Sequence, residues 1–113
     1  MPKTSKPLPA ASLHIVLALL GGELHGYALM RRVAELSDGA VNMGPGTMYG
    51  TLNRLLADGL IVETTDHHDR AGEERRRYYE LTGEGHTVAI AEYERLHALV
   101  RHVARSLPGG APA

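Results

Sequence analysis

NMGPGTMYGTLNRLLADGLI, residues 42–61, predicts a turn, a helix and the start of a strand, and this order decides the fold. Pro45 suits the first position of a helix, because its φ is fixed and it has no N–H to satisfy. Apolar residues then recur at helical spacing and predict a buried face made of Met48, Leu52, Leu55 and Leu56. Gly59 is a typical C-terminal cap. We therefore expect a helix over residues 45–58.

Two shorter helices are expected before this stretch. In the first, Leu13, Val16, Leu17 and Leu20 lie on one face, and Gly21 and Gly22 end it. The second follows His25 and Gly26 and ends near Asp38. We expect His25 to shape the start of that helix rather than to perform chemistry.

Two strands are expected after it. LIVETT, residues 60–65, is rich in β-branched residues, and RRRYYEL, residues 75–81, follows a polar loop, so the pair predicts a hairpin. Three short helices followed by a β-hairpin is the order of a winged helix-turn-helix. The fold class is thus mainly α with a small β-hairpin (α+β).

The last helix, predicted over residues 83–107, carries a heptad pattern. Its apolar residues are spaced 4, 3, 4, 3 and 4 apart, and they are Ala89, Tyr93, Leu96, Val100, Val103 and Leu107. That seam is narrower than the stripe of a helix lying on a globular core. The helix would be roughly 35 Å long, more than a small domain can cover. We therefore predict a homodimer in which two copies of this helix pair.

These elements divide the chain into four parts. Residues 1–10 hold three prolines and two lysines, which is typical of a flexible arm. Residues 11–82 form the predicted winged-helix domain and residues 83–107 the dimerisation helix. The tail, residues 108–113, is rich in Pro and Gly, and we expect it to be disordered.

Composition excludes several classes of protein. No cysteine is present, which excludes disulfides, thiolate metal sites and a Cys nucleophile. The longest aliphatic run, residues 15–20, is far shorter than the roughly 20 residues that span a bilayer. The first ten residues lack the apolar segment of a signal peptide, so we expect a cytoplasmic protein without a membrane partner. The net charge of −1 argues only weakly against nucleic acid, because the distribution of charge matters more than its sum.

The outward face of the 45–58 helix has the side chains of a DNA reader. At 100° per residue, the residues opposite the apolar face are Gly46, Thr47, Gly50, Asn53 and Arg54, with Tyr49 on the flank. Small residues allow close approach to a groove, and Thr, Asn and Arg can bond to bases and phosphates. In an isolated helix these would more often be ordinary surface residues, but the third place in a winged order favours DNA.

The second strand begins with Arg75, Arg76 and Arg77, and Arg70 lies in the preceding loop. On a wing, these arginines would bind phosphates beside the groove. An ordinary solvated charge run, partly neutralised by Glu73 and Glu74, explains the pattern equally well. Alternation turns Tyr79 and Leu81 inward, and Arg77 can still reach solvent near the loop, where the sheet is less covered.

Catalytic and metal sites are not indicated. His67, His68 and Asp69 are adjacent on a loop, and no HExxH spacing occurs, so we expect no metal and no cofactor. No GxSxG motif or evident carboxylate pair is present. The chain is not expected to be an enzyme.

Three motifs together resemble the PadR family of bacterial transcriptional regulators, in the short form with a single C-terminal helix. They are LALLGGELHGYALMRRV (residues 17–33), GPGTMYGTLNRLLADGLI (residues 44–61) and RRRYYELTGEG (residues 75–85). The resemblance runs from about Leu13 to Gly85. It implies a homodimeric winged-helix protein that binds double-stranded DNA, usually a repressor of its own and a neighbouring efflux or detoxification gene, released by a small-molecule inducer.

By position, the resemblance places Thr47, Tyr49, Asn53 and Arg54 on the DNA-facing helix, and Arg76 and Arg77 on the wing. Three features depart from the family pattern: Gly50 stands where Pro or Ala is common, Glu73 and Glu74 lie near a basic or Gly-rich region, and the last helix lacks a Trp. Ala89, Tyr93 and Leu96 are the candidate ligand-binding residues that remain. The alternative function is a winged-helix protein-interaction module without specific DNA binding.

Overall fold

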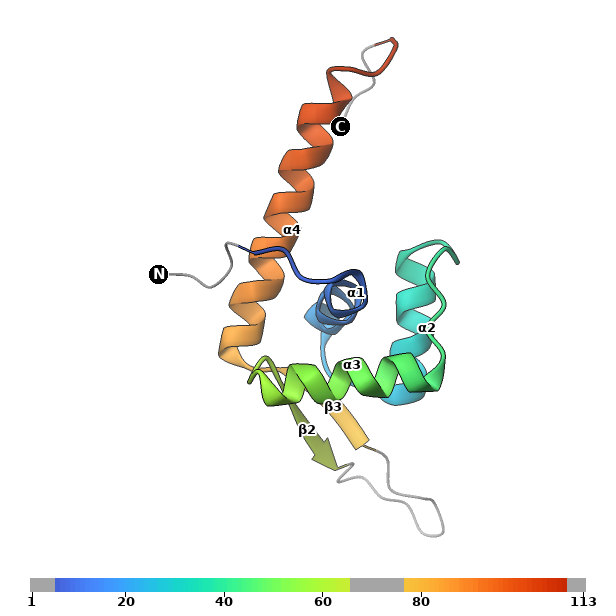
Figure 1. Cartoon of the computed structure of the whole chain (residues 1–113), viewed down its shortest axis with the longest axis vertical. Helices are drawn as coiled ribbons and strands as arrows, with labels where there is room; N and C mark the ends of the chain where they lie inside the picture. The colour runs from blue at the N-terminus through green and yellow to red at the C-terminus, as the bar shows by residue number, and fades with distance from the viewer. Residues whose placement is uncertain (1–5, 66–76, 110–113) are drawn as a thin grey trace.

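A computed structural model describes residues 6–65 and 77–109, and its elements follow the winged-helix order (Figure 1). The helices are α1 (Ala10–Ala18), the short 3-10 helix η2 (Leu19–Gly21), α2 (Gly26–Leu36), α3 (Pro45–Ala57) and α4 (Gly83–Ala104), and the strands are β1 (Leu24–His25), β2 (Ile61–Thr65) and β3 (Arg77–Leu81). The predicted fold class, mainly helical with a small antiparallel sheet and a long C-terminal helix, is confirmed.

The sheet has one strand more than the predicted hairpin. Its order is β1-β3-β2, with both pairs antiparallel. Leu24 pairs with Tyr79, and Ile61 pairs with Leu81. A strand of two residues has no periodicity from which it could be predicted. At the other end of the chain, α4 stops at Ala104, so Leu107 lies beyond the helix that was predicted to contain it.

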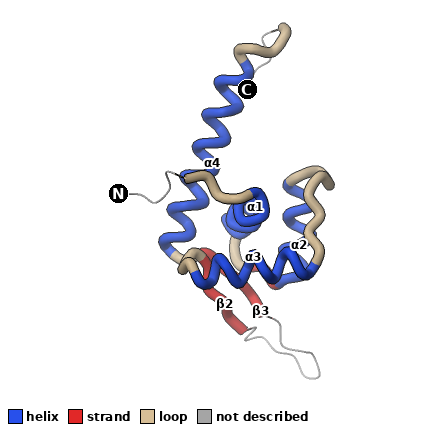
Figure 2. The backbone as a smooth tube through the Cα atoms, in the orientation of Figure 1, coloured by secondary structure: helices blue, strands red, loops and turns tan. Residues whose placement is uncertain are grey.

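Aliphatic side chains from every helix form one core, with α1 at its centre. Figure 2 shows α1 between α2 and α4, above α3, and α1 contacts all three. Ile15, Val16 and Leu29 meet Leu52 and Leu55 in the interior. Tyr79 is the aromatic residue of this core, as expected from its inward position on β3.

The end of α3 and the start of α4 are fastened together. Gly59, at a φ of 76°, closes α3. The Thr82 hydroxyl donates to the Gly59 carbonyl at 2.7 Å and accepts the Gly85 N–H at 3.0 Å, which caps α4. Gly85 lies directly against the backbone of Leu60. The long helix is therefore set at a fixed angle to α3.

The segment before α1 is attached to α4. The backbone N–H of Leu8 donates to Glu92 Oε2 at 2.9 Å, and Arg95 Nη1 forms an ion pair with the same oxygen at 3.0 Å. Glu92 is buried, and Leu8 packs against the core. Leu8, which lies in the predicted flexible arm, is thus bonded to α4, whereas residues 1–5 lie outside the described ranges.

The C-terminal half of α4 projects from the domain (Figure 1). The radius of gyration is 16.1 Å, and the extents are 58 × 34 × 23 Å. A compact chain of this length would have a radius of gyration of about 13 Å. The excess comes from a helix that extends beyond what its own domain covers.

Candidate nucleic-acid interface

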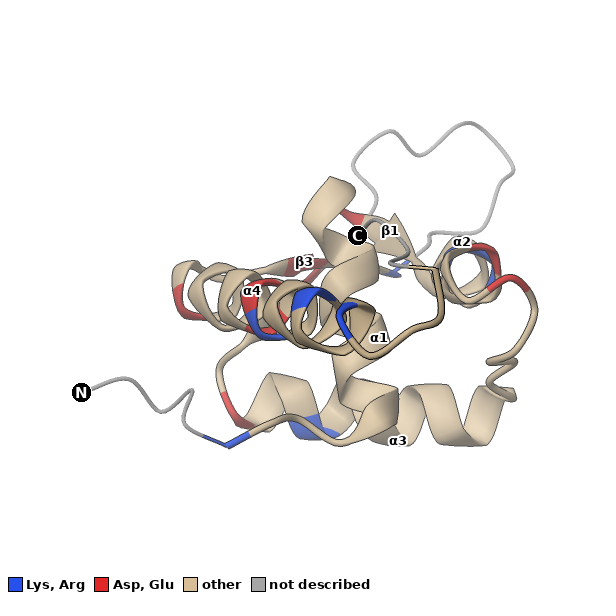
Figure 3. Cartoon of the chain, turned by 90° about the horizontal axis from the view of Figure 1, so that it is seen from above, with Lys and Arg blue, Asp and Glu red and all other residues tan. Residues whose placement is uncertain are grey.

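The face of α3 that was predicted to meet DNA is open to solvent. Met48, Leu52 and Leu55 are buried on the opposite side, so the helix has the orientation predicted from its periodicity. The predicted contact residues on the open side, Thr47, Tyr49, Gly50, Asn53 and Arg54, are all exposed. Most of α3 is neutral (Figure 3), and Arg54 is its basic residue. The exposed face of α3 can therefore form hydrogen bonds through its polar side chains, and its glycine lets a partner come close to the helix backbone.

Gly50 has no packing role within its own chain. A Cβ at this position would have no heavy atom within 4 Å. Glycine in a helix costs about 1 kcal/mol relative to Ala. Since no intrachain contact requires that cost, close approach to a partner is a physical reason for Gly50.

Tyr49 lies on the flank of α3, and its ring packs against the start of α2. A Cβ on Gly26 would lie 3.2 Å from Tyr49 Cζ and closer still to the phenol oxygen. The absence of a side chain at Gly26 therefore leaves the space that the Tyr49 ring occupies. Tyr49 is 44% exposed, so part of its side chain remains open to solvent beside the contact with α2.

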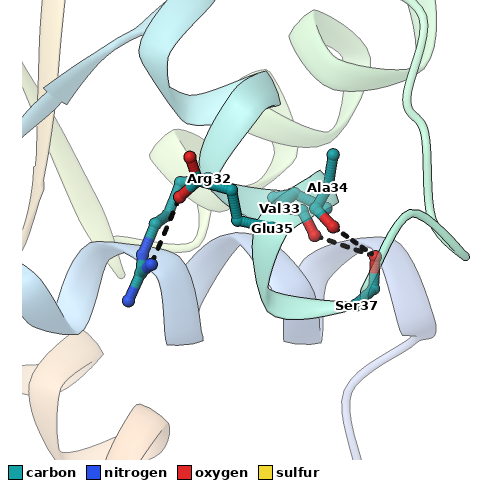
Figure 4. A network of polar contacts seen from close by, with 5 residues as sticks. All are labelled: Arg32, Val33, Ala34, Glu35 and Ser37. Carbon is teal, nitrogen blue, oxygen red and sulfur yellow. Dashed lines mark hydrogen bonds and ion pairs between the residues drawn. The ribbon is translucent and has the colours of Figure 1, made fainter.

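The turn between α2 and α3 is held by Ser37 (Figure 4). Its hydroxyl donates to the Val33 carbonyl at 2.9 Å, as Figure 4 shows. It also accepts the Val41 N–H at 2.9 Å. Asp38 and Gly39 both have positive φ, at 52° and 81°. One side chain thus ends α2 and directs the chain into the turn, which fixes the angle between the two helices of the helix-turn-helix.

The described part of the wing carries an exposed arginine. Arg77 Nε lies 3.4 Å from Glu63 Oε2, and both side chains are solvated, so this ion pair contributes little to stability. Arg77 shares a sheet face with buried Tyr79 and still reaches solvent, as expected near the loop. Burial, with the Glu63 carboxylate adding to it, raises the pKa of the Tyr79 hydroxyl above its ordinary value of 10.0. Arg70, Arg75 and Arg76 lie outside the described residues.

Sequence reasoning missed a groove between the start of α2, α3 and β3. It has a volume of about 730 Å³, and its polar lining comes from His25, Tyr27, Arg31, Tyr49 and Arg77. His25 Nδ1 accepts the Ala28 N–H at 3.3 Å, which caps α2 and agrees with the role expected for His25. The Arg31 guanidinium lies over the Tyr27 ring, 5.6 Å from its centroid. The i, i+4 spacing of Tyr27 and Arg31 could have revealed this pair.

Apolar side chains on the projecting half of α4 are exposed. Four of the six predicted dimerisation residues are exposed on α4, namely Tyr93, Leu96, Val100 and Val103, and Leu107 is exposed beyond the end of the helix. Leu99 and Ile90, which were not predicted, are exposed on α4 as well. Ala89 is a correction: it is completely buried in the core of its own subunit, so it cannot contact a second helix or a ligand. Tyr93 stacks on His97 with ring centroids 6.0 Å apart.

Comparison with known proteins identifies the family. Residues 16–91 match the model of the transcriptional regulator PadR-like family. The chain belongs to this family. PadR-like proteins are transcriptional regulators rather than enzymes, and the match covers α2, α3, the sheet and the first part of α4.

Two relatives of this PadR-like chain agree with the assignment. Transcriptional regulator Rv3488 of Mycobacterium tuberculosis is 37% identical over 94 residues, which are 83% of this chain and 82% of the relative. A PadR family transcription regulator from Clostridium difficile superposes with a TM-score of 0.72 at 25% identity, covering 86% of this chain and 97% of that one. A transcriptional regulator from Clostridium thermocellum shares the fold, with a TM-score of 0.66 at 24% identity and coverage of 84% and 87%.

The described ranges contain neither a membrane-spanning helix nor a metal-binding cluster. There, no helix is both long and apolar enough to cross a membrane. Within residues 6–65 and 77–109, no three His, Asp or Glu side chains gather closely enough to hold a metal ion. His67, His68 and Asp69 lie outside these ranges.

Proposed function

We propose that this PadR-like regulator is a homodimeric repressor that binds a pseudo-palindromic operator in double-stranded DNA. The observation that carries the proposal is the open face of α3, where Thr47, Asn53 and Arg54 surround a glycine with no intrachain neighbour. This face can enter a major groove, where Asn and Thr bond to base edges and Arg to a base or a phosphate.

The dimer is supported by the exposed apolar surface of α4. Leu96, Leu99, Val100 and Val103 lie on the projecting half of the helix, and their exposed fractions run from 37% to 56%. A second copy of α4 is the partner that fits, because the same stripe is self-complementary about a two-fold axis. Two α3 helices would then enter successive major grooves, with half-sites about 34–36 Å apart.

Regulation follows from the rigid joint between α3 and α4. Because Thr82 bonds to both Gly59 and Gly85, a change in the angle of the α4 pair would move the two α3 helices relative to each other. A small molecule that binds one arrangement of the dimer better than the other would release the operator. Tyr93 and Leu96, which are exposed on α4, are the candidate residues for such a ligand, and the regulated genes would be its own and a neighbouring efflux or detoxification gene.

Selection of bound genomic fragments, followed by electrophoretic retardation of the protein's own promoter, tests this function. Arg54→Ala should weaken binding to all sequences, whereas Asn53→Ala should change the preferred sequence. Arg105→Ala removes the same charge at the far end of α4 and should leave binding unchanged. If the wild-type protein retains no duplex, the proposal is wrong, and the winged-helix interaction module is the better account.

A further inference from the structure

The groove at the start of α2 has the chemistry of an anion site. Among the described residues that line it, the two charged side chains, Arg31 and Arg77, are both positive, and none is Asp or Glu. Arg77 is already paired with Glu63 at 3.4 Å, so Arg31 is the cation of the groove that has no ion pair with a described residue. Tyr27 and Tyr49 add two phenol groups, which can donate hydrogen bonds. This combination of guanidinium and hydroxyl donors is typical of protein sites that bind phosphate.

The backbone of α2 strengthens this preference. A helix N-terminus carries a partial positive charge, and no acidic residue in the first turn of α2 neutralises it. His25 caps the helix by accepting the Ala28 N–H through Nδ1, so that nitrogen carries no proton. The cap of α2 is therefore an imidazole nitrogen rather than a carboxylate.

Arg31 is aimed by its contact with Tyr27. Its guanidinium lies over the ring of Tyr27 at the edge of the groove, and it forms no ion pair with any residue that the structure describes. The adjacent Arg32 is different, because its Nη1 lies 3.4 Å from Glu35 Oε1 and it does not line the groove (Figure 4). Two neighbouring arginines thus differ in whether their charge is already paired.

The groove lies at the DNA-facing end of the molecule. Tyr49 connects it to α3, because its ring forms one wall while its neighbours on α3 face outward. The start of α2, the whole of α3 and the sheet lie at one end of the domain, and α4 projects from the other end (Figure 1). A duplex held by α3 would bring its sugar-phosphate backbone to this edge.

We propose that this groove binds one phosphate of the DNA backbone beside the segment that α3 contacts, with Arg31 as its main cation. Tyr27 orients the guanidinium, and the Tyr49 hydroxyl and the start of α2 complete the site. The inference rests on the proposed DNA-binding function and adds one phosphate contact per subunit. Such a contact positions the protein on the duplex and does not read sequence.

The test compares Arg31→Ala with Arg32→Ala by measuring DNA affinity as a function of salt. Each neutralised phosphate contributes about 0.9 to the log–log slope, so Arg31→Ala should make the slope of the dimer less steep by roughly 2. Affinity for operator and random duplexes should fall by a similar factor, about tenfold or more. Arg32→Ala should match the wild type in both respects.

A third variant separates charge from packing. Arg31→Lys keeps the cation but loses the planar contact with Tyr27, so it should recover most of the salt slope. If the slope of Arg31→Ala equals that of Arg32→Ala while the wild type binds DNA, the phosphate site is wrong and the proposed function stands. If the wild type binds no duplex, both fail. A lower melting temperature of Arg31→Ala with an unchanged slope would also overturn the site, because it would show a purely structural role.

Discussion

The ring of Tyr49, on α3, lies against the Cα of Gly26, the first residue of α2, with Cζ 3.2 Å from the place a Cβ would occupy. Nothing but glycine fits there without moving the ring. This contact joins the two helices of the helix-turn-helix at the edge of the surface that we propose faces DNA. The two consecutive residues therefore have different roles: His25 caps the N-terminus of α2, and Gly26 leaves space for the ring of Tyr49.

Gly26→Ala should therefore push the exposed end of the Tyr49 ring aside, and we expect a loss of about 1 kcal/mol, the low end of the cost of overpacking. Tyr49→Phe removes the oxygen that the new methyl group would meet first, so the double variant should recover part of that loss. Denaturant unfolding of the four proteins at one fixed concentration gives the coupling energy. Strictly additive effects of the two changes would show that Gly26 and Tyr49 do not interact.

Gly85→Ala should be more costly, because its Cβ would collide with the backbone carbonyl of Leu60 and would lie 2.8 Å from the carbonyl carbon. Backbone cannot rotate away as a side chain can, so we expect a loss of about 3 kcal/mol or more. Gly83, two residues earlier in the same helix, has no heavy atom within 4 Å of its added Cβ. Gly83→Ala is the matched control, and its unfolding free energy should change by less than about 1 kcal/mol.

Glu92 should hold the N-terminal segment on α4. Glu92→Ala removes the acceptor of the Leu8 N–H, so we expect a loss of about 1–2 kcal/mol and faster hydrogen exchange of the Leu8 amide. Glu94 is exposed on the same helix, and Glu94→Ala should stay within about 0.5 kcal/mol of the wild type. Unchanged exchange at Leu8 in Glu92→Ala would refute the attachment.

The exposed stripe on α4 should be the dimer contact. Leu99→Asp or Val103→Asp places a charge in that stripe, and either variant should sediment as a monomer at micromolar concentration and bind operator DNA far more weakly. Arg101 is two residues from both, so it lies on a different face of the helix. Arg101→Asp should remain dimeric. A wild-type protein that sediments as a monomer would contradict the assignment of this surface.

Periodicity predicted the helices well because buried residues recur at helical spacing wherever one side of a helix packs against the core of the domain. Met48, Leu52 and Leu55 are spaced for a buried face of α3, and the structure buries all three. The strand β1 could not be predicted, because two residues carry no period and only the pairing of Leu24 with Tyr79 makes them a strand. Tertiary contact, rather than local sequence, determines that element.

The heptad on α4 shows what spacing leaves open. Ala89 and Leu96 belong to the same seam, yet Ala89 is covered by its own domain and Leu96 is exposed. Spacing identifies an apolar face but does not identify the body that covers it. The role of Glu92 could not be predicted from the sequence for a related reason, because its partner is a backbone amide 84 residues earlier in the chain. Arg31 was missed because its importance depends on how close α2 lies to α3.

The salt dependence of binding to a duplex selected from genomic DNA tests the central claim most directly. If Arg54, Arg76 and Arg77 each bind one phosphate per subunit, as proposed, a dimer makes about six phosphate contacts, which predicts a log–log slope near −5, and Arg31 would make it about −7. Two protomers should be bound per operator. A slope close to zero on every duplex tested would contradict the account.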